Sequence, residues 1–173
     1  WEIIMEKLIF LIIIVFIALM GITNVSLKGE IPQDITQISQ DLKDRSKTKL
    51  ELVKEIYLFI NQSYTSPIRQ YLKEPEKVII TSVNDAWGAK GGYAPSHIQN
   101  QMAKIMLLET GKFQESDFRI EQGWCEISPH SILFVRINES TEIAIDTWFA
   151  DNGGMFNCYT KAPCGVEQKV CND

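Results

Sequence analysis

Residues 130–146 read HSILFVRINESTEIAID and predict a β-hairpin, because two β-branched and aromatic runs flank the polar segment 138–140. The midpoint of positions 130 and 146 is 138. A hairpin centred on Asn138 therefore places His130 directly opposite Asp146, with both side chains on one face. A carboxylate there would orient the imidazole and fix its tautomer. A structural ion pair is the alternative interpretation.

The sequence before this hairpin predicts helices. The capping box Thr48-x-x-Glu51 opens a helix over 48–63, and a stripe of apolar residues predicts a central helix over 95–110 that Gly111 ends. Shorter helical segments are expected at 31–42 and 75–87, and strands at 118–120, 131–137 and 142–149. Helices first and an antiparallel sheet afterwards predict an α+β fold, with N-terminal helices packed on the sheet.

The beginning of the sequence predicts export. Lys7 precedes an unbroken apolar run, Leu8 to Met20, which suits a signal-peptide core better than the roughly 20 residues of a spanning helix. No good cleavage site follows it, so residues 1–26 are expected to be a signal peptide or a membrane anchor. A buried core helix is a less favoured alternative, since the run has no polar face. We expect an extracytoplasmic protein that is secreted, periplasmic, or anchored in the membrane by this segment.

The remaining sequence predicts a single domain. Residues 27–46 are polar and are expected to form a stalk with one docking helix, and 47–173 the folded domain with a cysteine-rich C-terminal tail. The chain carries a net charge of -5 and shows no basic cluster interleaved with aromatic residues. Nucleic acid is therefore not an expected partner.

The cysteines are even in number and predict disulfides, in agreement with export. Two disulfides would anchor the turn-rich tail after Asn152, and three connectivities are open. A zinc site is the less favoured alternative, because no CxxC pair exists and both histidines lie far from the cluster in sequence. No metal is expected. The four cysteines are Cys125, Cys158, Cys164 and Cys171.

The start of the central helix is a suitable place for a nucleophilic cysteine. Unsatisfied N–H groups and the helix dipole stabilise a thiolate there. The glycine-rich loop 88–93 leads to this start, where a cysteine facing His130 and Asp146 would form a triad. The residue in that place is Ala94.

This order of features resembles the transglutaminase-like superfamily, a relative of the papain-like cysteine peptidases, and its bacterial branch of transglutaminase-like cysteine proteinases. The match covers about 84–149. In that family a Gly-x-Cys start of the helix gives the nucleophile. The residues that carry the resemblance are Trp87, Gly91-Gly92, Asp117-Phe118-Arg119-Ile120 and His130-Ser131-Ile132-Leu133.

The resemblance implies roles for five residues. Ala94 stands at the nucleophile position, within Gly92-Tyr93-Ala94, and His130 and Asp146 are the other two members of the triad. Trp87 and Tyr93 would shape the cleft and the oxyanion site, although a core role is the more usual one for Trp87. No cofactor is expected.

Alanine at position 94 rules out cysteine-based acyl transfer in this chain, because a methyl group cannot attack a carbonyl. Ser96 is a weak alternative nucleophile, for which capping or exposure is the better interpretation, and His97 is expected to pack or lie at the surface. Natural loss in a pseudoenzyme and replacement of a cysteine by an experimenter both remain open.

Two functions from different classes are therefore expected. One is a peptidase or acyltransferase, active when residue 94 is cysteine, acting on protein or peptidoglycan-linked peptide amides. The other is a non-catalytic module that binds a peptide or a partner protein.

Overall fold

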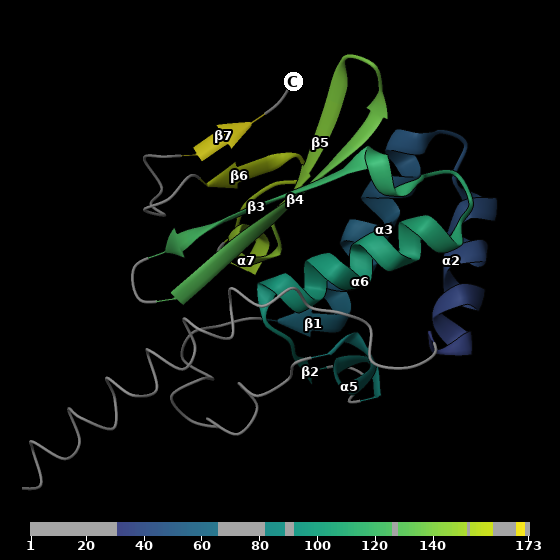
Figure 1. The fold of residues 1–173 in the computed structure, drawn as a ribbon, viewed down its shortest axis with the longest axis horizontal. Coiled ribbons are helices and arrows are strands. Elements are labelled where there is room, and N and C mark those ends of the chain that lie inside the picture. Colours follow the sequence, from purple (N-terminus) through teal and green to yellow (C-terminus); the bar gives the residue numbers. More distant parts are fainter. Residues whose placement is uncertain are drawn as a thin grey trace, which may run out of the picture.

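The computed structural model describes residues 31–65, 82–88, 92–125, 128–151, 153–160 and 169–171. Helices dominate its first half and the larger sheet follows, so the expected α+β class is confirmed (Figure 1). The helices are α2 (Gln33–Arg45), α3 (Lys49–Ser63), α5 (Val83–Gly88), α6 (Ser96–Glu109), the 3-10 turn η2 (Glu115–Asp117) and α7 (Thr147–Asp151). The strands are β1 (Tyr64–Thr65), β2 (Gly92–Tyr93), β3 (Phe118–Cys125), β4 (Ser128–Asn138), β5 (Thr141–Ile145), β6 (Cys158–Thr160) and β7 (Lys169–Cys171).

The larger sheet is antiparallel, in the order β3-β4-β5. Side chains of β4 alternate between its two faces. Leu133 and Val135 lie in the main core cluster with the helices, whereas Ile132 and Phe134 lie in a second cluster with Tyr159 of β6. Helices therefore pack on one face of the sheet and the β6–β7 hairpin on the other.

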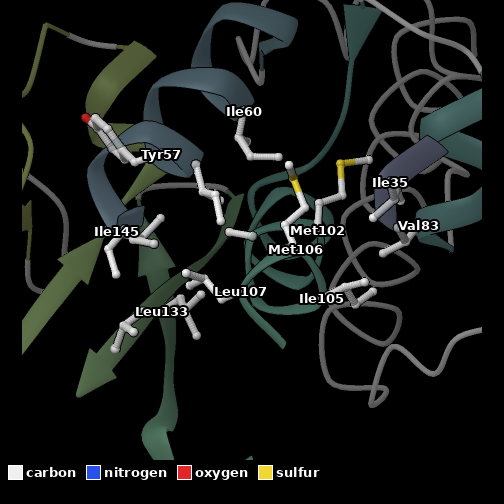
Figure 2. Close-up of a cluster of buried hydrophobic side chains, with 14 of the residues drawn as sticks. Ile35, Tyr57, Ile60, Val83, Met102, Ile105, Met106, Leu107, Leu133 and Ile145 are labelled. Carbon is white, nitrogen blue, oxygen red and sulfur yellow. The ribbon is translucent and has the colours of Figure 1, made fainter. Parts of the chain in front are cut away.

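Helix α6 is the central element of the main core and contacts β4, α2, α3 and α5. Its expected apolar stripe, Ile98, Met102, Ile105 and Met106, is at most 2% exposed. Figure 2 shows side chains of the helices and of the sheet gathered in this cluster. Gly111 follows the helix at φ 67°, a left-handed conformation that glycine adopts without strain.

Helix α3 begins at the predicted capping box. The backbone N–H of Glu51 donates to Thr48 Oγ1 at 3.1 Å, and the Glu51 carboxylate accepts the N–H of Thr48 at 3.3 Å. Two of the N–H groups at the helix start are thereby satisfied. This prediction is confirmed.

The hairpin of β4 and β5 is present, but its register differs from the expected one. Leu133 pairs with Ile145, so Asp146 continues at the level of Ile132, and His130 lies two residues further along β4. The direct opposition of His130 and Asp146 was wrong. The turn centre lies one residue later than expected, beside a register irregularity in β4, and a shift of the centre by one residue moves the pairing by two.

The second strand of the hairpin is also shorter than expected. It ends at Ile145, and the residues predicted to extend it to position 149 begin α7 instead. Asp146 Oδ1 accepts the backbone N–H of Phe149 at 2.9 Å, a bond typical of a helix N-cap. The cap therefore outweighs the β-propensity of the Thr147-Trp148-Phe149 run.

Helix α2 contains the docking helix expected within 31–42. Ile35 is fully buried and Leu42 is 5% exposed, and both belong to the main core cluster. The side chains of Thr36 and Gln40 also bond to Glu109 at the end of α6. The core therefore includes Ile35 and Leu42, which lie within the segment 27–46 expected to be a stalk.

The signal peptide or anchor expected at 1–26 lies outside the described residues, as does 66–81, which includes the start of the helix expected at 75–87. Of the helices that the structure describes, none has both the length and the apolar character needed to cross a bilayer.

Candidate functional site

His130 and Asp146 lie together at the end of the sheet. His130 Nε2 donates to Asp146 Oδ2 at 3.2 Å, and the two side chains are 3% and 0% exposed. The contact is diagonal across the strands, a span that a side chain as long as histidine can bridge. The predicted hydrogen bond is confirmed although the predicted register was wrong.

The carboxylate of Asp146 accepts three N–H groups. Oδ1 receives the backbone N–H of Phe149 at 2.9 Å, and Oδ2 receives the backbone N–H of Thr160 at 3.1 Å as well as the imidazole. An ionised carboxylate suits this environment, because it only accepts hydrogen bonds. The two backbone donors fix its orientation, so His130 donates from Nε2, and in a neutral ring Nδ1 is then the acceptor.

Nδ1 of His130 is buried and has no hydrogen-bond partner among the residues that the structure describes. The ring packs against Trp148 of α7, with centroids 5.5 Å apart and planes at 63°. Asp146 and Trp148 together fix both the rotation and the plane of the imidazole. A neutral imidazole held in this way presents a lone pair at Nδ1, as a general base requires.

Helix α6 and strand β4 start at the same end of the domain (Figure 1). Asn100 Nδ2 donates to the carbonyl of Ser131 at 2.8 Å. Four residues later, the ammonium group of Lys104 lies over the ring of Phe118, which pairs with Val135. The N-terminus of α6 therefore lies toward the end of β4 that carries the histidine.

The histidine and the helix nevertheless belong to opposite faces of the sheet. Alternation along β4 puts His130 on the face of Ile132 and Phe134. Ser131 points toward α6, where its hydroxyl accepts a hydrogen bond from Asn100 Nδ2 at 2.9 Å. A residue that precedes α6 can therefore meet the imidazole only around the end of β4.

Ala94 lies at the junction of β2 and α6, one residue before Pro95, the N-cap. Its side chain is fully buried in the main core cluster. Its carbonyl accepts Gln99 Nε2 at 2.8 Å. A cysteine at this position would be buried in this conformation, so a substrate would reach it only after the surroundings open.

Trp87 is placed as a core residue. It is 3% exposed, its indole N–H donates to Asp34 at 2.9 Å, and its ring lies 6.0 Å from that of Phe59. Trp87 therefore belongs to the core, the more usual role of a tryptophan, with its indole donor engaged. Tyr93 pairs with Thr65 through its backbone, and its side chain lies outside the described residues.

Ser96 and His97 begin α6. Ser96 is 5% exposed, and the helix has no side-chain cap bond, so the serine neither caps the helix nor faces solvent as expected. His97 is partly buried, and this burial lowers its pKa to about 4. His97 is therefore neutral near pH 7.

Tyr57 of α3 is a buried phenol near the site. Burial, reinforced by the negative charge of Asp146, raises the pKa of Tyr57. Its ring also packs on Phe156, with centroids 5.2 Å apart. The phenol therefore stays neutral at physiological pH.

A disulfide joins Cys158 and Cys171 and closes the β6–β7 hairpin. This is one of the tail disulfides expected from the sequence. The side chain of Cys125 and the whole of Cys164 lie outside the described residues. Within the described ranges, no three His, Cys, Asp or Glu side chains gather as metal ligands.

Three residues of the site were missed from the sequence. Gln99 and Asn100 could have been found from the sequence, because they are polar residues beside the apolar stripe of a central helix. In the structure they are 0% and 1% exposed. Thr160 contributes a backbone N–H from a distant hairpin, which no side-chain pattern encodes.

Comparisons with protein-family models, with curated proteins and with solved structures found no match to this chain.

Proposed function

We propose that this domain has the site of a transglutaminase-like Cys-His-Asp acyl-transfer enzyme in which Ala94 occupies the nucleophile position. The proposal rests above all on the imidazole of His130, which bonds to Asp146 through Nε2 and has a buried Nδ1 with no hydrogen-bond partner among the described residues. The start of α6, where a thiolate would be stabilised, lies toward the same end of β4.

The roles follow from this geometry. With cysteine at position 94, Nδ1 of His130 takes the thiol proton and the thiolate attacks the carbonyl carbon of a peptide amide. The imidazolium, held by Asp146, then gives its proton to the departing amine. The substrates in this proposal are protein or peptide amides outside the cytoplasm, a location that agrees with the disulfide. With Ala94 the chain performs no such reaction.

A second candidate function is a non-catalytic, extracytoplasmic module that binds a peptide or a partner protein. The burial of Ala94 in the apolar cluster favours it, because a packed methyl group is what a purely structural position requires. The two candidates make opposite predictions for a thiol at position 94.

The thiolate titration of Ala94→Cys separates these functions. Thiolate absorbance near 240 nm, taken as the difference from the Ala94 chain at each pH, reports the new thiol even while it is buried. Under the catalytic proposal its pKa lies at least roughly one unit below the value of about 8.5 for free cysteine. Adding His130→Ala removes most of that decrease.

Ala103→Cys is the matched control, since Ala103 is also fully buried and lies on α6, further from its start. Burial alone raises the pKa of that thiol above about 8.5. If the thiol at position 94 titrates like the one at position 103, the catalytic proposal is wrong and the binding module is the better account.

A further inference from the structure

Two consecutive amide side chains near the start of α6 connect residue 94 to the strand that carries His130. Gln99 donates from Nε2 to the carbonyl of Ala94 at 2.8 Å, and its own backbone N–H bonds to Pro95 at 3.0 Å. Gln99 therefore makes two hydrogen bonds to the two residues that directly precede α6. Gln99 is 0% exposed.

Asn100 makes the second connection. Its Nδ2 donates to both the carbonyl and the hydroxyl of Ser131, at 2.8 and 2.9 Å. Ser131 directly follows His130, so these bonds fix the backbone next to the imidazole. The adjacent amides thus bond in different directions, one to the chain before the helix and one to the sheet.

Both amides are only half satisfied. Gln99 Oε1 and Asn100 Oδ1 are buried and have no hydrogen-bond partner among the described residues. Burying a polar atom without a partner is unfavourable, and an apolar residue of similar size would fill either place without that cost. Filling the core therefore does not explain the two amides, and the hydrogen bonds that they donate need a further role.

We propose that Gln99 and Asn100 are positioning residues, with Gln99 holding residue 94 and Asn100 holding the start of β4, so that residue 94 and His130 share one rigid frame. The purpose assigned to this frame rests on the proposed function. Nucleophile and base must stay within a narrow geometry for reaction, and hydrogen bonds to the backbone at each position provide this. Neither amide is assigned contact with a substrate.

The test uses the chain with alanine at position 94, so it does not depend on any reaction. One reporter is the methyl order parameter of Ala94 by NMR, and the other is the set of ring resonances of His130. Gln99→Met should lower the order of Ala94 from about 0.85, typical of rigid backbone, toward 0.6 while the His130 resonances stay in place. Asn100→Leu should shift the His130 resonances and leave the Ala94 methyl ordered.

The methyl group of Ala103, on the same helix, controls for general loosening and should be unchanged. If a variant does not fold, Gln99→Leu or Asn100→Ala replaces it, since each also removes the amide donor and leaves no unpaired polar atom in the core. The proposal is overturned if both variants move both reporters alike, or if neither reporter moves. This crossed pattern distinguishes failure here from failure of the thiolate titration, which concerns the chemistry of residue 94 alone.

Discussion

Asp146 has two structural roles. It starts α7 through Phe149 and orients the ring of His130, and the N–H of Thr160 completes its set of donors. The hydrogen bond between His130 and Asp146 could be predicted from the sequence, because alternation along the hairpin puts both side chains on one face. The capping role could not, since an aspartate after an apolar run is equally consistent with a strand that continues.

Asp146→Asn should destabilise the domain by about 3 kcal/mol, because asparagine has one acceptor oxygen for three buried donors and turns an N–H toward at least one of them. Urea unfolding followed by circular dichroism measures the change. Glu139→Gln, an exposed change on the β4–β5 turn, is the control and should stay within about 0.5 kcal/mol. Equal unfolding midpoints for the two variants would show that the carboxylate does not stabilise the domain.

His97 should make the stability depend on pH. Burial lowers its pKa from 6.5 to about 4, so between these values the unfolded chain binds a proton that the folded chain does not. The contribution is fully present above pH 6.5 and is lost as the pH falls toward 4, on the order of 1 to 3 kcal/mol for this partly buried ring.

Urea unfolding at pH 7 and pH 4.5 measures this loss. His97→Gln should reduce the difference between the two pH values, because glutamine does not titrate. An unchanged difference in that variant would mean that His97 is as well hydrated in the folded chain as in the unfolded one.

At the scale of elements, the β6–β7 hairpin supports the site from the face opposite α6. Tyr159 packs against Phe134 with centroids 5.1 Å apart, and Thr160 supplies its N–H to Asp146. The disulfide Cys158–Cys171 lies two residues from that N–H along β6. The hairpin therefore stabilises both the second apolar cluster and the carboxylate.

Replacing both cysteines, Cys158→Ser with Cys171→Ser, should lower the free energy of unfolding by about 3 kcal/mol, as expected for a cross-link over a sequence separation of 13. The hydrogen exchange of the Thr160 amide should become faster, because the hairpin opens more readily. Amide exchange measured by NMR tests both points. Unchanged protection of Thr160 in the double variant would mean that packing alone holds the hairpin.

Several elements followed from local sequence, and others did not. The capping box of α3 and the buried stripe of α6 are local patterns, and both appear as predicted. The register of β4 with β5 depends on a bulge, and the end of β5 depends on a cap, so each is decided by a single residue rather than by a periodic pattern. The burial of α2 in the core could not be predicted, because its apolar stripe is weak and its burial depends on tertiary packing.

At the scale of the whole molecule, the domain brings the start of α6 and the start of β4 to one end while keeping the helix and the imidazole on opposite faces of the sheet. The α+β class could be predicted from the order of the elements. The sequence could not predict that residue 94 can reach the imidazole only around the end of β4, because this depends on how α6 crosses the sheet. The proposed site requires residue 94 to approach His130 in this way.

The nuclear Overhauser effect between the Ala94 methyl group and His130 Hε1, the ring proton next to Nδ1, tests most directly whether residue 94 faces the imidazole in the chain with alanine at position 94. If residue 94 faces the imidazole, a clear cross-peak between these two groups is expected beside the peaks between His130 and Trp148 that their ring contact implies. Peaks from His130 to Trp148 with none to Ala94 would overturn the proposed site, because residue 94 would then lie too far from the imidazole to be its nucleophile.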